Sequence, residues 1–297
     1  MFTLTIANRK GGSGKTTTAV NLACQLSINY PDKRILIIDL DTQNHVKLGL
    51  GNSKNKTSLG IHSIFSHTQY TISGLIQPTQ WKNLSYIEAD EEALEINTGN
   101  GFHRLKYFLA NENIKQNFDL VILDTPPSHG AFLINAIIAS DAILITFVPQ
   151  TLDKTGVNKI MKLIKRHANK KIKLALLPTM TKSRIRHHNF TLASLVKNYG
   201  TSFLLKGIRA GIQLAEAFES GLPIQYYAPK SRGAYDYHML LNELRLMWPE
   251  ILQDVTVNNS QFSKAVTKTS TLSKSANKNT FNQFSKSPTY QYSQTKH

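Results

Sequence analysis

The sequence predicts an α/β domain in which helices cover both faces of a mostly parallel, doubly wound sheet. Short runs rich in Ile, Leu and Val recur along the chain, at residues 2–7, 34–40, 118–123, 142–148 and 171–177. These runs are almost continuously apolar, which is typical of strands buried on both faces. Helix-like sequence separates them, and strands that alternate with helices form parallel sheets.

The later helices and the end of the domain are marked by composition. Besides a helix at residues 16–28, the apolar spacing predicts helices at residues 184–198, 210–220 and 234–247. The folded domain is expected to span residues 1–252. Residues 253–297 are rich in Ser, Thr, Asn, Gln and Lys. Because such a segment buries too little apolar surface to fold, we predict a disordered tail.

Composition excludes several classes of protein. No uncharged apolar run reaches the length of about 18 residues that a membrane span needs. The N-terminus has no basic lead before its first apolar segment, so we expect a cytoplasmic protein. Cys24 is the only cysteine, which excludes an internal disulfide, a cysteine zinc site and a cysteine-ligated iron–sulfur cluster within one chain. We expect Cys24 to pack in the core.

A glycine-rich loop joins the first predicted strand to the first predicted helix. In this context backbone N–H groups can wrap phosphates. Lys15 is expected to reach the β- and γ-phosphates, and the Thr16 hydroxyl to ligate Mg²⁺. Arg9 occupies the first glycine position of the strict P-loop pattern, and a second lysine begins the loop. The predicted phosphate-binding residues are Lys10, Gly11, Gly12, Ser13, Gly14, Lys15, Thr16 and Thr17.

Acidic residues follow two of the predicted strands. Asp124 comes after four apolar residues, where a P-loop ATPase places a carboxylate for Mg²⁺. Asp39 lies at the end of the run at residues 34–40, and Asp41 directly follows this run. Because the carboxyl ends of parallel strands meet in one crevice, all three carboxylates should lie beside the loop. We predict a magnesium site at Thr16, Asp39 and Asp124.

Four segments together resemble the ParA partition ATPases of the small type without an N-terminal helix-turn-helix. They are KGGSGKTT at residues 10–17, DLDTQ at 39–43, FDLVILDTPPS at 118–128 and GIRAGIQLAEAFESGLPIQYYAPKSRGAYDY at 207–237. The resemblance covers about residues 1–250. It implies a homodimer that sandwiches two ATP molecules, in which Lys10 crosses to the partner's phosphates.

The resemblance also assigns roles to single residues. Lys15 and Thr16 would act on the nucleotide of their own chain, and Asp41 would orient the attacking water, so that Lys10, Lys15 and Asp41 are the predicted catalytic residues. Thr42 stands where this family commonly has Pro, which leaves both neighbouring carboxylates in place. In similar proteins the segment after the late strand, here Pro178, Thr179 and Met180, lies near the adenine. The guanine-specific Asn-Lys-x-Asp pattern is missing, which favours ATP over GTP.

The net charge of +16 is unevenly distributed. Residues 1–153 carry a net charge of −1, whereas residues 154–215 carry 14 Lys and Arg and no acid. Residues 216–253 are net −2, and residues 254–297 are net +5. A basic surface confined to one region predicts a polyanion partner, here duplex DNA bound without sequence preference. The candidate contacts are Lys173, Arg184, Arg186, Arg209, Lys230 and Arg232.

These observations predict a dimeric ATP-dependent switch with weak ATPase activity. It would bind the nucleoid and segregate a plasmid or chromosome with a ParB-like adaptor. The alternative is a ParA-like ATPase that positions a protein cargo on the nucleoid, with the same ATPase core. A paralogue that binds ATP without hydrolysis is disfavoured because Lys10, Lys15, Asp41 and Asp124 are all present. Membrane binding is disfavoured because residues 254–297 have no helical apolar stripe.

Overall fold

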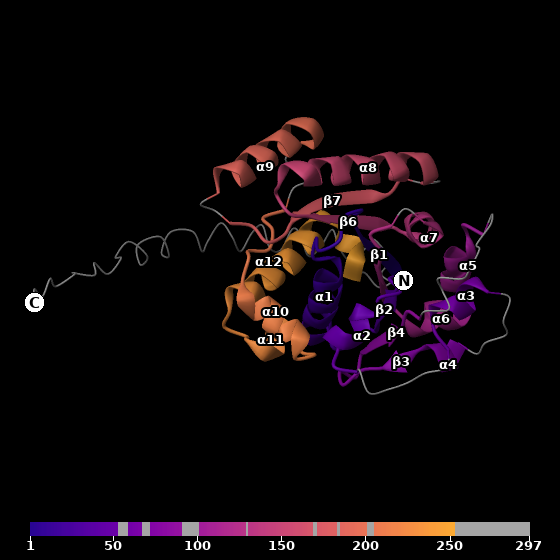
Figure 1. Ribbon diagram of the computed structural model, residues 1–297. Helices are drawn as coiled ribbons and strands as arrows, with labels where there is room; N and C mark the ends of the chain where they lie inside the picture. Colours follow the sequence, from indigo (N-terminus) through magenta and orange to yellow (C-terminus); the bar gives the residue numbers. More distant parts are fainter. Residues whose placement is uncertain are drawn as a thin grey trace, which may run out of the picture. The chain divides into compact units, whose positions relative to one another are not determined.

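The computed structural model describes residues 1–52, 59–66, 72–90, 101–128, 130–168, 171–182, 185–200 and 205–252. Within these residues a seven-stranded sheet has the order β3-β4-β2-β5-β1-β6-β7 (Figure 1). Neighbouring strands pair in parallel except β3 and β4, which are antiparallel. The strands are β1 Phe2–Ala7, β2 Ile35–Asp39, β3 Gln77–Pro78, β4 Leu84–Ile87, β5 Leu120–Asp124, β6 Ala142–Phe147 and β7 Lys173–Pro178.

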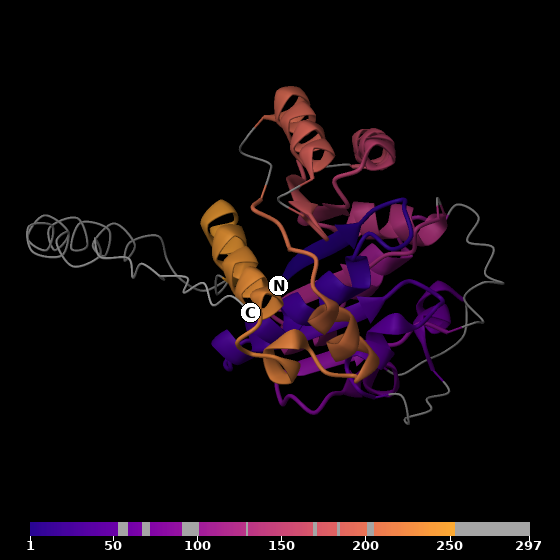
Figure 2. The same ribbon diagram turned by 60° about the vertical axis from the view of Figure 1, so that its left-hand side comes forward.

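Helices cover both faces of this sheet, as Figure 1 and the turned view of Figure 2 show. Their bounds are α1 Lys15–Asn29, α2 His45–Gly49, α3 Ile61–Phe65, α4 Ile72–Leu75, α5 Arg104–Ala110, α6 Glu112–Asn117, α7 Ala131–Ala139, α8 Thr151–His167, α9 Arg186–Tyr199, α10 Ile212–Glu219, α11 Ile224–Tyr227, α12 Arg232–Met247 and the 3-10 helix η3 Pro249–Leu252. The predicted doubly wound α/β fold is therefore confirmed.

Each face of the sheet has its own hydrophobic core, because successive strand residues point to opposite sides. On one side Leu4 and Ile6 of β1 pack in a cluster with residues of α1 and α12. Cys24 belongs to this cluster and is fully buried, as expected. On the other side Ile143 and Ile145 of β6 pack with residues of α7, α8 and α9. A third cluster joins β2 and β5 to α3, α5 and α7.

The strands β3 and β4 were not predicted. They are short, and Pro78 removes a backbone donor while Ser85 interrupts the apolar pattern, so neither segment stands out as a strand. The predicted helix at residues 184–198 begins at Arg186 as α9, and the described part of the chain ends at Leu252, with η3. Residues 253–297 lie outside the described residues, so the disordered tail stays a prediction.

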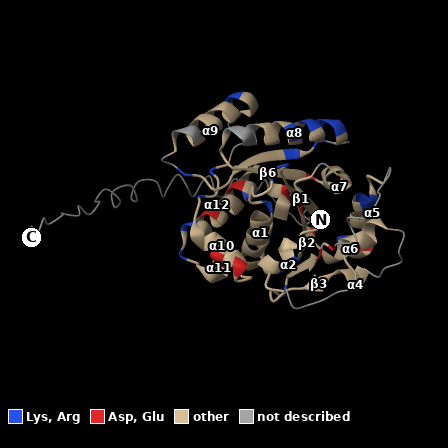
Figure 3. Ribbon diagram, viewed as in Figure 1, with Lys and Arg blue, Asp and Glu red and all other residues tan. Residues whose placement is uncertain are grey.

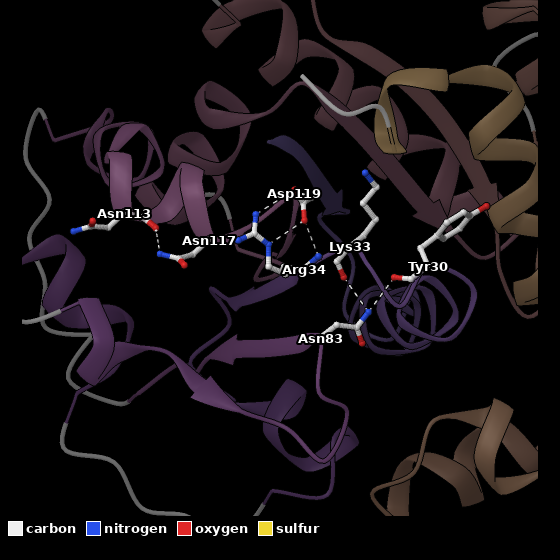
Figure 4. Close-up of polar contacts among 7 residues, drawn as sticks. All are labelled: Tyr30, Lys33, Arg34, Asn83, Asn113, Asn117 and Asp119. Atoms are coloured by element: carbon white, nitrogen blue, oxygen red, sulfur yellow. Dashed lines mark hydrogen bonds and ion pairs between the residues drawn. The ribbon is translucent and has the colours of Figure 1, made fainter. Parts of the chain in front are cut away.

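Side-chain hydrogen bonds join loops at the edge of the sheet where β2 and β5 begin (Figure 4). The Asn83 amide nitrogen lies 3.0 Å from the Tyr30 carbonyl oxygen and 2.9 Å from that of Lys33, and so holds the loop between α1 and β2. The Ser27 hydroxyl donates to the Asn83 amide oxygen. Asp119 accepts the Arg34 backbone N–H at 2.8 Å, just before β5.

We expect Asn83→Ala to lower the free energy of unfolding by about 2 kcal/mol, because backbone carbonyls of the α1–β2 loop lose their donor. Chemical denaturation measures the change. Asn113→Ala is the matched control, since Asn113 is exposed, and its effect should stay within about 0.5 kcal/mol. Equal losses in the two variants would contradict the role given to Asn83.

Candidate nucleotide site

Three adjacent strands end at the site. Ile6 of β1 and Asp39 of β2 both pair with Asp124 of β5, so the ends of these strands are level. The loop at residues 10–17 follows β1 and leads into α1. It therefore lies at the same edge of the sheet as the two carboxylates, as the sequence predicted.

The loop is shaped by glycines. Gly12 and Gly14 have φ values of 68° and 78°, in the left-handed region that a residue without Cβ adopts at little cost. Gly14 precedes α1 as its N-cap, without a side-chain capping bond. The first N–H groups of a helix have no partner within the helix, so they are free to bind an anion. This geometry supports the predicted phosphate-binding loop.

Hydrogen bonds of the Asn8 and Thr179 side chains hold the loop in place. The Asn8 amide donates to the Thr146 carbonyl of β6 at 2.6 Å, and its oxygen accepts the Lys10 N–H at 3.2 Å. The Thr179 hydroxyl, just after β7, donates to the Ser13 carbonyl at 2.9 Å. Asn8 and Thr146 were not predicted from the sequence. The one signal for Asn8 in the sequence is a polar side chain directly after the apolar run at residues 2–7.

Buried charges surround the first residue of α1. Asp39 and Asp124 are both fully buried, and Lys15 is only 6% exposed. Burial lowers the pKa of Lys15, while the nearby Asp124 and Asp41 carboxylates raise it. Burial raises the pKa of Asp124 to about 7, although the Thr16 hydroxyl and the Lys15 ammonium lower it. Burial and the Asp124 charge raise the pKa of Asp39 well above its ordinary value.

The two aspartates differ in their hydrogen bonds. Asp39 accepts the backbone N–H of Asp41 at 2.9 Å and that of Val46 at 3.0 Å. Neither buried carboxylate oxygen of Asp124 accepts a hydrogen bond of ordinary geometry among the described residues, although the Thr16 hydroxyl and the Thr125 N–H lie near enough to lower its pKa. A buried carboxylate without partners fits a hard cation such as Mg²⁺. We therefore assign Asp124 as the first candidate ligand and keep Asp39 and Thr16 as further candidates.

The described residues hold no group of three or more His, Cys, Asp and Glu that could bind a metal. Mg²⁺ sites commonly use one or two carboxylates, with substrate phosphates and water as the other ligands. The residues around Asp124 suit such a shared site, in which the metal arrives with the nucleotide.

Two predicted catalytic residues lie at the rim of the site. Asp41 is half-buried, and its carboxylate accepts the Gln43 N–H at 3.3 Å. The Lys10 ammonium lies 3.5 Å from the side-chain oxygen of Gln150, which directly precedes α8. Both residues keep their predicted roles as proposals.

A cavity of about 690 Å³ opens beside the loop and suits the rest of a nucleotide. Gly14 and Thr17 line it together with Thr179 and Met180. Pro178, the third residue predicted near the adenine, is not among the lining residues. Met180 has a φ of 50°, which is uncommon for a residue other than glycine. The next residue, Thr181, forms a β-bridge with Arg209, so the chain here lies against the segment at residues 205–210. Gly207 permits this approach, since a Cβ there would lie 2.5 Å from the Pro178 carbonyl oxygen.

Two of the predicted DNA contacts are neutralised by acidic residues of the folded domain. Lys173 forms an ion pair with Glu250 at 2.8 Å, and Arg209 forms one with Asp236 at 2.7 Å. Arg184 lies outside the described residues, and nothing is described of the Arg186 side chain. Lys230 is exposed just before α12, and Arg232 begins that helix. Figure 3 shows Lys and Arg spread over several elements, with a concentration on α8.

The fold and the site define a P-loop NTPase, with the second lysine that marks its deviant form. Residues 1–176 match the family model described as AAA domain. The sporulation initiation inhibitor protein Soj of Bacillus subtilis is 33% identical over 250 residues, covering 81% of this chain and 97% of Soj. The chromosome partitioning protein ParA of Myxococcus xanthus is 31% identical, covering 80% of this chain and 86% of that protein.

Solved structures agree on the fold. An ATP complex of a McdA variant from Cyanothece superposes with a TM-score of 0.74 at 20% identity, covering 86% of this chain and 99% of that one. The chain belongs to the ParA/MinD family of P-loop ATPases. It is an ATPase, and its cofactors are ATP and Mg²⁺.

Without nucleotide and Mg²⁺, we expect the stability of the protein to fall as the pH rises from 5 to 8. The native Asp124 carboxyl keeps its proton up to a pKa of about 7, whereas its ordinary value is 3.8. The native state thus binds more protons than the unfolded state between these values, and deprotonation favours unfolding. Asp124→Asn should flatten this slope and be more stable than the wild type at pH 8 by about 2 kcal/mol.

Denaturant titrations at several pH values measure this slope. Asp119→Asn is the control, because Arg34 holds the pKa of Asp119 below its ordinary value, so this carboxyl does not titrate between pH 5 and 8. Identical slopes in the wild type and in Asp124→Asn would show that the Asp124 carboxyl is already charged at pH 5.

Proposed function

We propose that this protein is a dimeric, ATP-dependent switch that binds DNA nonspecifically and drives plasmid or chromosome partition with a ParB-like adaptor. The observation that carries the proposal is the site at the ends of β1, β2 and β5. There a phosphate-binding loop with a second lysine, Lys10, lies beside the unpartnered Asp124 carboxylate. Nucleoid association would follow from DNA binding.

Each residue has a distinct proposed role. Lys15 and the loop N–H groups bind the phosphates, and Thr16 and Asp124 hold Mg²⁺. Asp39 fixes the loop that carries Asp41, through its bonds to the backbone N–H groups of residues 41 and 46. Asp41 orients the attacking water. Lys10 is at the rim, where it can reach the phosphates bound by a partner chain.

The relatives support DNA partition as the process in which this protein acts. Soj of Thermus thermophilus, named a chromosome-partitioning ATPase, is 29% identical over 245 residues, covering 81% of this chain and 94% of that protein. The second candidate is the positioning of a protein cargo on the nucleoid, and the fold likeness to McdA is compatible with it. In the described residues no helix is long and apolar enough to cross a membrane.

We expect Asp41→Ala to retain ATP and Mg²⁺ and to accumulate as a dimer, because a positioned water matters for cleavage and not for ground-state binding. Phosphate release should fall at least about 100-fold, the usual range for a group that assists proton transfer. Light scattering with ATP should show a persistent dimer. Thr42→Ala, one residue away, serves as the control and should keep its turnover. Unchanged turnover in Asp41→Ala would remove Asp41 from the mechanism.

We expect binding to duplex DNA to require ATP and to weaken steeply with salt, because Lys and Arg contacts to phosphate release condensed counterions. With about four to six phosphates neutralised per dimer, the slope of log K against log salt is about −4 to −5. Fluorescence anisotropy with two unrelated duplexes tests the lack of sequence preference. Lys15→Ala should lose ATP binding and DNA binding together. The absence of ATP-dependent binding at about 50 mM salt would contradict the proposed switch.

A further inference from the structure

One face of α8 carries four exposed positive side chains. Val157, Ile160, Leu163 and Ile164 are buried and fix the inner face of this helix in the core. The exposed face carries a set of cations that we name the α8 stripe: Lys159, Lys162, Lys165 and Arg166. Figure 3 shows blue segments on α8. The spacing of three and four residues aligns them on one side.

The cations of the α8 stripe form no ion pair within the described part of the chain. No acidic residue occurs between residues 154 and 215, so none is near in sequence to neutralise them. By contrast, the cations at 173 and 209 are paired with Glu250 and Asp236. An ion pair with an acidic side chain weakens the attraction of each of these two cations for an external phosphate.

The dipole of α8 accounts for only part of the stripe. Cations stabilise a helix when they lie in its last turn, near the negative end. Lys165 and Arg166 lie in the last turn of α8, but Lys159 and Lys162 do not. Self-repulsion among four like charges on one face is unfavourable for the isolated helix. A polyanion that neutralises them would remove this cost.

We propose that the α8 stripe is the main contact of the described domain with the DNA backbone. This proposal rests on the proposed function. Residues 159 to 166 span about 10 Å of helix at a rise of about 1.5 Å per residue. Duplex DNA carries one charge per about 1.7 Å of its axis, so the stripe can face several phosphates at once. Contacts to phosphate alone carry no sequence information, which matches nonspecific binding.

The position of α8 also explains how nucleotide would control this contact. Gly156 of α8 packs against Asn8, which ties the phosphate-binding loop to β6, since a Cβ on Gly156 would lie 3.0 Å from the Asn8 side-chain oxygen. Gln150, next to α8, lies near Lys10. A dimer formed around ATP would hold two copies of α8 at a fixed separation. Two linked basic faces bind far more tightly than either face alone.

The test replaces Lys159, Lys162 and Lys165 together by alanine in the full chain. Alanine is the best helix former, so α8 should persist, and melting temperature and ATP affinity verify this. The control replaces Lys82, Lys106 and Lys115, which are also exposed and change the net charge equally; of these, Lys115 pairs with Glu112 at 3.2 Å. We expect the α8 variant to bind DNA with ATP about 10- to 100-fold more weakly at 100 mM salt. Its salt slope should be shallower by about 2 to 3 for the dimer as a whole.

The control variant should bind DNA like the wild type, with the same salt slope. If the wild type binds DNA with ATP and both variants bind equally well, the α8 assignment is overturned while the proposed function stands. If the wild type itself shows no ATP-dependent binding, the proposed function fails, and the α8 assignment fails with it. Normal DNA binding with a lost response to the adaptor would mean that the stripe binds an acidic protein, which also overturns the proposal.

Discussion

The burial of two carboxylates and an ammonium group at the end of the sheet is the constraint on which the site depends. Asp39 and Asp124 lie side by side in the register of β2 and β5, fully excluded from solvent. Two neighbouring carboxylates in such a place cannot both ionise at little cost, and Lys15 compensates only one charge. The site is therefore incomplete in electrostatic terms until a divalent cation and a phosphate chain arrive together. Binding of nucleotide and Mg²⁺ would therefore relieve the electrostatic repulsion between carboxylates that folding has buried side by side.

The fold tolerates this cost because the surroundings are rigid. The glycine-rich loop is tied to β6 by Asn8 and to the end of β7 by Thr179, so its N–H groups do not need the ligand for their orientation. Preorganised dipoles stabilise charge more effectively than dipoles that must reorient. Asp39, which accepts two backbone N–H groups, joins the metal side of the site to the segment at residues 41–46. The loop that carries Asp41 is thus fixed to the same strand end.

Much of this arrangement could be predicted from the sequence. Continuous apolar runs located β1, β2, β5, β6 and β7, because burial on both faces leaves little freedom of composition. Because the loop and the carboxylates follow these strands in the sequence, they could be predicted to lie at the same edge of the sheet. The small strands β3 and β4 could not be found, since β4 is held by its pairing with β2 and β3 by its pairing with β4, and not by their own composition. The roles of Asn8 and Thr146 depend on contacts across 138 residues, which no local pattern shows.

The charge pattern shows most clearly where sequence and structure differ. The count of cations singled out residues 154–215, but it treated all of them as equivalent. Folding brings acids from the segment at residues 216–253 against two of these cations, through Asp236 and Glu250. What attracts a polyanion is the charge that remains exposed and unneutralised after folding, and not the sum over a segment. On this criterion the exposed face of α8 is the strongest candidate for DNA binding among the described residues. The sequence alone does not distinguish its lysines from the cations that form ion pairs.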